Sequence, residues 1–568
     1  MHDMVQMFVE IYMSSWYAQP NEKYKGGFPM LRKIGSLLLA LVMLLGGTAL
    51  AEVTPNGEFP VVDTPAEISV WTSIPGTQTD YTNNATTKYY EEKTGVHVNW
   101  IEVADAERAT LFNTSLASTN YPDYYMTTVN STDLISYYED GVIIPLNDLI
   151  DQYSVYLKQL LDENPSVREA ITAPDGNIYS FPMVNYIPAQ NVDAKIYVYK
   201  EWLQKYTEEI GNAKPNTAEG LEEMLLYFRD HDMNGNGDPS DEIVLTGHYQ
   251  YNNTGVPVFY MLNGFCYVPN DYFYVGDDGR VCSNVKSDEF REGLRYANKL
   301  FKEGLIDEGT FVQSLTTFRS LTTTTKDKVT VAACAAPYPF RVLTMQSGVD
   351  NAVEWKDYEV LEPMQRADGT TVVAGVSTVN VATFGMITTA CKNPEVVMRW
   401  VDSIYSPEMR EYLIYGGKEG KGWEWQDGVK SIAGEDRAVV SLLDAVERNA
   451  IWLPDWVGSW VTEEMYCNNA AESDSAEAPL RVADGKLYDK YLKETGIPKI
   501  TWCTDQDTTV EFGELNTLFV DYLNTAISEF TLGTRNIDDD NVWQEYLDTL
   551  DSMGYDHYCD VATRYYFQ

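Results

Sequence analysis

Residues 68–100, ISVWTSIPGTQTDYTNNATTKYYEEKTGVHVNW, decide the fold class of this chain. Residues 68–71 form a short apolar strand that leads into a Pro-Gly turn. Residues 79–93 contain neither Gly nor Pro and are followed by Gly95, a typical helix stop, so they predict a helix. Apolar residues then alternate over 96–100, which indicates a second strand. Strand, helix and strand in this order predict a βαβ unit.

Similar alternation continues along the chain. Helices are predicted over 146–163, 200–209, 217–229 and 287–303, and an extended segment over 177–182. The helix over 217–229 follows a Thr cap, the one over 287–303 has acids in its first turn and Gly304 at its end, and both carry apolar residues on one face. Helices that alternate with strands predict an α/β fold.

Composition and charge exclude several classes of protein. The chain has 568 residues, 44% of them hydrophobic, which is enough for two or three packed domains. The net charge of −44 argues against binding to nucleic acids or anionic lipids. The seven cysteines include no C-x-x-C pair, which excludes a zinc ribbon and a thioredoxin-type motif but leaves one or two disulfides open.

The N-terminal region indicates export. Residues 30–51 combine the basic Arg32 and Lys33, an apolar run and the cleavage pattern Ala49-Leu50-Ala51, which is typical of a signal peptide. Residues 1–29 lack these features and are interpreted as a wrongly chosen start of the chain. We expect an extracellular or periplasmic protein without a lipid anchor, because no Cys lies near the cleavage site.

The clearest chemical motif is HDMNGNGDPSDE at 231–242. Its oxygen-bearing side chains are spaced as a hard cation such as Ca²⁺ requires, and an EF-hand loop begins in the same way. An EF-hand would, however, have Glu where this chain has Ile243. The alternative is an ordinary turn between a helix and a strand. We predict a structural calcium site formed by Asp232, Asn234, Asn236, Asp238, Asp241 and Glu242.

No catalytic motif stands out in the sequence. The five His residues are scattered, and no G-x-S-x-G, Walker or G-x-G-x-x-G pattern occurs. With 85 acidic residues, a pair of carboxylates that flanks a glycosidic bond could exist, but the sequence selects none. The expectation is therefore a protein that is not an enzyme.

The tryptophans point to a polar ligand. Five of them crowd one stretch, at 423, 425, 452, 456 and 460, and Trp71 ends the first predicted strand, where α/β crevices open. Flat rings in such places can stack on sugar faces while amides and carboxylates bond the hydroxyls. For each Trp alone, core packing is the commoner role, but as a cluster they predict at least one ligand contact.

Several segments together resemble the family 1 extracellular solute-binding proteins of ABC-type sugar importers, in particular their oligosaccharide-binding branch. The resemblance covers nearly the whole chain after the signal peptide. It rests on Tyr121-Pro-Asp123, on the 231–242 loop, and on GVIIPLNDLI (141–150), PDGNIYSFP (174–182), Trp202-Leu203, LFKEGLID (300–307), Trp400 and Ser406-Pro-Glu408.

The resemblance implies a periplasmic-binding-protein-like fold with two lobes, hinge crossovers and a ligand cleft between the lobes. It places 67–190 with about 362–435 in an N-terminal lobe and 191–361 with about 436–568 in a C-terminal lobe, after a linker at 52–66. With the tryptophan cluster, it predicts a ligand-binding set of Trp71, Asp123, Tyr186, Tyr338, Trp423 and Trp456.

Other roles are open for part of this set. Asp123 could cap a helix, and Tyr186 and Tyr338 could pack at a hinge. Many proteins of this kind carry a lipid-anchored Cys at the cleavage site, and this chain has Ala51-Glu52 there.

The expected function is capture of a carbohydrate, an oligosaccharide in particular, and its delivery to the transmembrane subunits of an ABC permease by a monomeric protein. Two alternatives stay open: a secreted carbohydrate-active enzyme, and a sensor that presents a glycan to a membrane kinase.

Overall fold

The computed structural model describes residues 52–74, 80–186, 194–212, 215–249, 253–346, 348–375, 379–443, 447, 460–472, 477–498 and 500–567. All of them belong to one compact unit, Glu52–Gln568. The segments 1–29 and 30–51 lie outside the described residues, as does Trp456.

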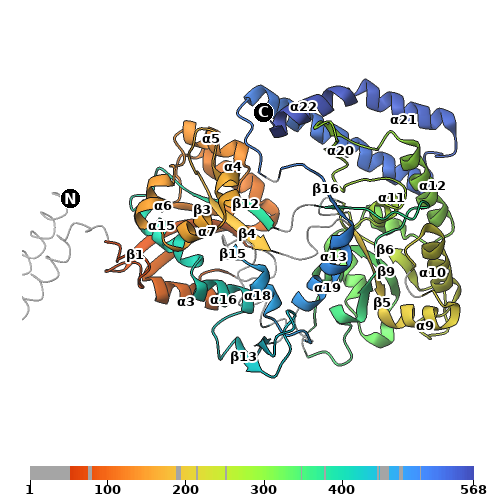
Figure 1. Ribbon diagram of the computed structural model, residues 1–568, viewed down its shortest axis with the longest axis horizontal. Helices are drawn as coiled ribbons and strands as arrows, with labels where there is room; N and C mark the ends of the chain where they lie inside the picture. The colour runs from red at the N-terminus through yellow and green to blue at the C-terminus, as the bar shows by residue number, and fades with distance from the viewer. Residues whose placement is uncertain are drawn as a thin grey trace, which may run out of the picture. The chain divides into compact units, whose positions relative to one another are not determined.

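A six-stranded mixed sheet organises the first lobe, which we define as this sheet with the helices around it (Figure 1). The strand order is β15 (Trp460–Val461), β4 (Phe181–Tyr186), β12 (Val379–Ile387), β3 (Tyr124–Thr128), β1 (Ala66–Ile74) and β2 (Val96–Ala104). Strands β1, β2 and β3 are parallel, and β12 runs antiparallel to both of its neighbours. The helices are α3 (Ala85–Thr94), α4 (Arg108–Ala117), α5 (Ser131–Glu139), α6 (Asn147–Tyr153), α7 (Tyr156–Glu163), α8 (Pro165–Ile171), α15 (Pro394–Ile404) and α16 (Pro407–Tyr415).

A four-stranded sheet organises the second lobe. Its order is β10 (Tyr358–Val360), β5 (Lys195–Tyr199), β9 (Val331–Ala336) and β6 (Ile243–Thr246). One large apolar core joins this sheet to helices that lie between its strands and after them in the sequence. Those helices are α9 (Lys200–Ile210), α10 (Ala218–Asp230), α11 (Pro257–Leu262), α12 (Asp288–Lys302), α13 (Leu315–Thr322), α14 (Pro339–Val342), α19 (Ala478–Tyr488), α20 (Gln506–Leu532), α21 (Asp540–Ser552) and α22 (Tyr555–Phe567).

Among the described residues, the remaining strands form three two-stranded pairs, and there is one further short α-helix. The pairs are β7 (Tyr274–Val275) with β8 (Val281–Cys282), β11 (Val373–Gly375) with β16 (Leu492–Glu494), and β13 (Trp423–Asp427) with β14 (Arg437–Ser441). Helix α18 (Glu463–Cys467) follows β15.

The predicted α/β class and the predicted βαβ unit are confirmed. Strands β1 and β2 pair in parallel, with Val70 opposite Trp100. Helix α3 begins later than predicted, because the Asn84 side chain accepts from the Thr86 N–H and caps it there. It ends at Gly95, which adopts the left-handed conformation that glycine allows (φ 73°).

The prediction of one helix over 146–163 is wrong. The segment forms α6 and α7 with a break at Ser154, whose backbone is extended. The buried Asp402 carboxylate on α15 explains the break, because it accepts the Ser154 hydroxyl at 2.6 Å and the backbone N–H groups of Val155 and Leu157 at 3.0 and 2.8 Å. A side chain from elsewhere in the fold therefore starts a new helix.

The segment predicted as a linker, 52–66, contacts the first lobe. Val61 and Val62 are buried, and the Arg399 guanidinium donates to the Pro55 and Glu58 carbonyls at 3.1 and 3.0 Å. Strand β15 pairs with β4 in the first sheet, although its residues fall in the range predicted for the C-terminal lobe. The domain boundaries stay a prediction.

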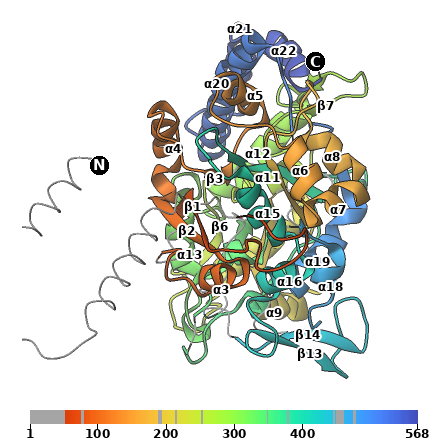
Figure 2. The ribbon, with the colours of Figure 1, turned by 90° about the vertical axis from the view of Figure 1, so that its left-hand side faces the viewer.

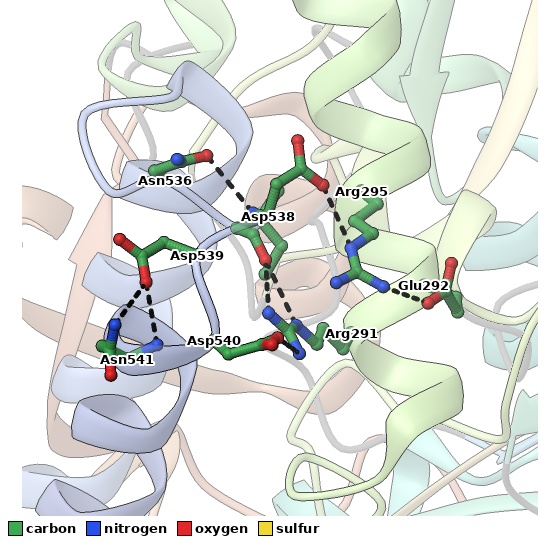
Figure 3. A network of polar contacts seen from close by, with 9 residues as sticks. Arg291, Glu292, Arg295, Asn536, Asp538, Asp539, Asp540 and Asn541 are labelled. Carbon is green, nitrogen blue, oxygen red and sulfur yellow. Dashed lines mark hydrogen bonds and ion pairs between the residues drawn. The ribbon is translucent and has the colours of Figure 1, made fainter.

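A polar clamp fastens the C-terminal helices to α12 (Figure 3). The Arg291 guanidinium donates twice to the Ile537 carbonyl, at 3.2 and 3.0 Å, and lies 2.8 Å from the Asp540 carboxylate. Its side chain is only 11% exposed and lies over the Trp543 ring. Arg295, 31% exposed, reaches Asp538 at 3.1 Å. Because Asp540 is 89% exposed, the carbonyl bonds and the ring contact matter more than the ion pair.

This clamp predicts unequal effects of two similar substitutions. Arg291→Ala removes both donors from the Ile537 carbonyl and should lower the free energy of unfolding by about 2 kcal/mol. Arg295→Ala, the matched control, removes exposed ion pairs and should cost under about 1 kcal/mol. Urea denaturation followed by circular dichroism measures both values, and equal losses would contradict this account of the clamp.

Candidate ligand-binding cavity

A cavity of about 1080 Å³ lies between the two lobes. On the first lobe it is lined by the end of β3 and the residues after it, 127–133, and by residues of α4. Because β1, β2 and β3 are parallel, their carboxyl ends lie at one edge of the sheet, where α/β crevices form. The second lobe contributes residues 269–271, Phe273 and side chains of α20 and α22.

The segment between β16 and α20 closes one side of the cavity and contacts both lobes. Thr495, Ile497 and Thr501 line the cavity. Thr501 exchanges hydrogen bonds with the Ser131 hydroxyl at the start of α5, and the Trp502 indole N–H donates to the Ala170 carbonyl at 2.8 Å. The cavity is therefore bounded by parts of the chain more than 350 residues apart in sequence.

The first-lobe wall is polar and holds a constrained cation. Arg108 donates to the Thr128 hydroxyl at 3.0 Å and lies 3.6 Å from the Asp105 carboxylate. The Asn130 amide donates to the Asp133 carboxylate at 3.3 Å, and burial raises the pKa of Asp133. Arg108, Asp133 and Asp271 are the charged groups among the described lining residues.

The second-lobe wall is rich in aromatic rings. Phe512 on α20 stacks on Tyr565 of α22 with centroids 4.0 Å apart, and Phe273 lies 4.5 Å from the Tyr558 ring. The Tyr558 hydroxyl donates to the Asn516 amide oxygen at 2.8 Å. These rings give the cavity flat apolar faces beside polar groups, the combination that polar ligands with apolar faces require.

Asp271 differs from the other acids of the cavity. No hydrogen bond or ion pair joins its carboxylate to another residue in the part of the chain that the structure describes. The side chain is open to the cavity, yet enough protein surrounds it that burial raises its pKa. Asp271 lines the same cavity as Tyr558, Tyr565 and Tyr566 of α22.

The cavity lining contains none of the five described residues of the predicted ligand-binding set. Trp71 is buried behind the wall, 5.4 Å from the lining ring of Phe112. Asp123 precedes β3, at the end of the strand away from the cavity, and accepts from the Ser69 N–H and hydroxyl at 2.7 Å. The ligand-binding role of the set stays a prediction.

The other three described members have protein partners. Tyr186 ends β4, and burial and Glu463 raise its pKa. Tyr338 follows β9, accepts from Arg341 Nε at 2.9 Å and carries the Arg481 guanidinium 4.0 Å from its ring centre. Trp423 is 2% exposed, and its indole N–H donates to the Gly417 carbonyl at 2.8 Å.

Trp423 belongs to a small core of its own, with Tyr415, Val439 and Met465. Its strand, β13, lies in Figures 1 and 2 at the opposite end of the described unit from α20 and α22, which line the cavity. Packing accounts for the position of this Trp.

The residues that line the cavity were missed at the sequence level, and one signal could have found some of them. The run Thr127-Thr-Val-Asn130 spans the end of β3, the third parallel strand, and polar residues at such strand ends mark the crevice. For Asp271 and Asn516 no comparable local signal exists.

The predicted calcium loop connects α10 to β6. The Asp232 carboxylate accepts the N–H groups of Gly235 and Gly237, both at 2.7 Å. Asp241 accepts the amides of Asn234 and Asn236 at 3.1 and 2.6 Å. A third acidic residue, Asp238, bonds Ser240 within the loop. The carboxylate oxygens of the loop therefore accept hydrogen bonds from other residues of the same loop.

Glu242 has one unsatisfied oxygen. Its Oε1 accepts the N–H groups of Met233 and Asn234, at 2.9 and 3.3 Å, whereas Oε2 is buried without a hydrogen-bond partner. Burial also raises the pKa of Glu242. Among the described residues, no group of three or more His, Cys, Asp or Glu side chains is arranged to hold a metal ion.

Comparison with known proteins shows that the chain is similar to an ABC transporter substrate-binding protein. It is 26% identical over 492 residues to the fructooligosaccharide ABC transporter substrate-binding protein FusA of Streptococcus pneumoniae, covering 84% of this chain and 86% of FusA. The structure of FusA with kestose superimposes with a TM-score of 0.72 at 24% identity, over 88% of this chain and 98% of that one. The resemblance to extracellular solute-binding proteins is confirmed. So is the two-lobed α/β fold.

A second solved structure has a similar fold. It is an EF-hand mutant of FusA in complex with fructo-nystose, which matches with a TM-score of 0.71 at 23% identity, over 88% of this chain and 98% of that one. No protein-family model matches the chain. Within the described residues, no helix is long and apolar enough to cross a membrane.

The packing of Trp423 leads to a prediction. Trp423→Ala should lower the free energy of unfolding by about 3–5 kcal/mol, because it empties a buried site and leaves the Gly417 carbonyl without its donor. Trp425→Ala, on the same strand but half-buried, should cost about 1 kcal/mol. Chemical denaturation measures both. A stable Trp423→Ala protein that has lost ligand affinity would instead assign this Trp to the binding site.

Proposed function

We propose that the protein captures an oligosaccharide between its two lobes and delivers it to the transmembrane subunits of an ABC permease. The observation that carries this proposal is the cavity of about 1080 Å³, lined by both lobes, with aromatic faces beside amide, hydroxyl and carboxylate groups. In this role the protein catalyses no reaction. The similarity to a fructooligosaccharide-binding protein supports the proposal.

The walls divide the work of binding. Rings such as Phe112 on the first lobe and Phe273 on the second can stack on sugar faces. Thr128 and Asn130 at the end of β3 can bond sugar hydroxyls. Because Phe273 lies on the other lobe from the three remaining residues, a sugar gains its full contacts only when the lobes are close together.

Lobe closure would then report on occupancy. The chain passes from the first sheet to the second between β4 and β5, and returns between β10 and β12. A ligand that contacts both walls favours the closed arrangement, and a permease that recognises this arrangement favours it as well. The lobes of this proposal are 67–190 with about 362–435 and 191–361 with about 436–568.

Export belongs to the same proposal. The signal peptide at 30–51 would take the chain across the membrane, and the protein would act as a monomer outside the cell or in its envelope. The absence of Cys near the predicted cleavage site supports a form without a lipid anchor.

We further propose that the 231–242 loop binds Ca²⁺ as a structural ion. Carboxylates of Asp232, Asp238, Asp241 and Glu242, with the amide oxygens of Asn234 and Asn236, supply the oxygen ligands that Ca²⁺ prefers. The buried, unpartnered Oε2 of Glu242 fits this role, because a cation would satisfy it. The two amides bond Asp241 through their nitrogens, and rotating them presents their oxygens.

Ligand binding predicts a shift in thermal melting. An oligosaccharide at 100 times its dissociation constant should stabilise the protein by about 2.7 kcal/mol and raise the melting temperature. Neutral and acidic oligosaccharides are compared by differential scanning fluorimetry, with chromatography of the sugar afterwards. A shift with intact sugar supports a binding protein, whereas cleaved sugar would replace it with a carbohydrate-active enzyme.

Calcium removal predicts a second shift. A chelator should lower the melting temperature, and Glu242→Gln should abolish the calcium dependence, because it removes one ligand charge. The exposed Glu208→Gln is the matched control and should melt like the unaltered protein in calcium and in chelator. A melting temperature that does not respond to calcium would remove the ion from the proposal.

A further inference from the structure

We propose that Asp271, together with the Asn516 amide, makes the cavity select uncharged sugars over acidic ones. This inference rests on the proposed function, because it names the class of oligosaccharide that the same cavity accepts. It assigns a specificity role to two residues from segments 245 residues apart, one in the loop before β7 and one on α20.

Asp271 is placed to accept hydrogen bonds from a ligand. Its carboxylate opens into the cavity, lacks a hydrogen bond or ion pair with any other described residue, and lines the same cavity as the tyrosines of α22. A carboxylate that opens into a cavity in this way can accept hydrogen bonds at both of its oxygens. Sugar hydroxyls can donate to both of its oxygens, so a neutral glycan satisfies the group.

Asn516 supplies the complementary donor. The Tyr558 hydroxyl donates to the Asn516 amide oxygen at 2.8 Å, which orients the amide and leaves its NH₂ group for the cavity that Asn516 lines. A sugar hydroxyl both donates and accepts. A carboxylate and an amide NH₂ on the same wall can therefore bind sugar hydroxyl groups, and together they do not favour a charged group.

The charge balance of the cavity disfavours acidic sugars. Among the described lining residues, two carboxylates, Asp133 and Asp271, face one guanidinium. That guanidinium, on Arg108, already contacts the Thr128 hydroxyl and lies 3.6 Å from the Asp105 carboxylate. A uronate would bring a further negative charge into the cavity, and like charges in a confined space repel strongly.

The test compares neutral and acidic trisaccharides by isothermal titration calorimetry. The probes are kestose, maltotriose and a trimer of mannuronate, with the unaltered protein, Asp271→Asn and Asp277→Asn. Asp277 is an exposed Asp six residues away, outside the cavity lining, and serves as the matched control. Circular dichroism and the melting temperature without ligand verify that each variant is folded.

The unaltered protein should bind at least one neutral trisaccharide, and the mannuronate trimer at least tenfold more weakly. Asp271→Asn should weaken the affinity for the neutral trisaccharide by about ten- to a hundredfold, because hydrogen bonds to a charged acceptor are strong. The difference in affinity between the neutral and the acidic trisaccharide should become smaller. The affinities of Asp277→Asn should stay within twofold of those of the unaltered protein. Asn516→Asp, a second variant that keeps the bond from Tyr558, should weaken neutral binding by about tenfold.

The outcomes distinguish a failure of the selectivity inference from a failure of the proposed function. If neutral sugars bind but Asp271→Asn and Asn516→Asp behave like Asp277→Asn, the selectivity inference is wrong and the proposed function stands. The same holds if the unaltered protein prefers the mannuronate trimer. If no probe binds the unaltered protein, carbohydrate capture itself fails, and the inference fails with it.

Discussion

The parallel pairing of β1 with β3 is the constraint on which the candidate site depends. Val70, Trp71 and Thr72 lie opposite Tyr124, Tyr125 and Met126, and bonds from Ser69 to Asp123 hold the two strands together where β3 begins. Because the strands run the same way, the chain leaves both of them at one edge of the sheet. The polar residues after β3 therefore line the cavity, while Asp123 lies at the other end and serves the sheet.

The second wall depends on the C-terminal helices and on what holds them in place. Helix α20 carries Phe512 and Asn516 into the cavity, and α22 carries its tyrosines beside them. Arg291 of α12 satisfies the carbonyl between α20 and α21, so a contact remote from the cavity orients this wall. The segment that leads into α20 of the second lobe is bonded to the first lobe through Thr501 and Trp502. Movement of one lobe against the other would have to accommodate these bonds.

Charge acts differently on the surface and in the cavity. The chain carries a net charge of −44, which keeps acidic polymers away from most of its surface. In the cavity, the same excess of acids becomes a source of hydrogen-bond acceptors, because carboxylates without cationic partners are available to hydroxyl groups. In the 231–242 loop, Asp232 and Asp241 accept hydrogen bonds from their own loop, and one oxygen of Glu242 is buried without a hydrogen-bond partner.

The sequence by itself determined the α/β class, the parallel β1–α3–β2 unit, the helix cap at Thr217, and the resemblance to solute-binding proteins. These features depend on local periodicity, on capping chemistry and on motifs in a fixed order, all of which are written in consecutive residues. Tertiary structure decided the rest, because it depends on partners far away in the chain. Asp402 broke a helix that the local pattern made continuous, and Trp423 packs in a small core with Tyr415, Val439 and Met465. Asp271 and Asn516 share one cavity only because α20 returns to the loop before β7, and no local pattern predicts that approach.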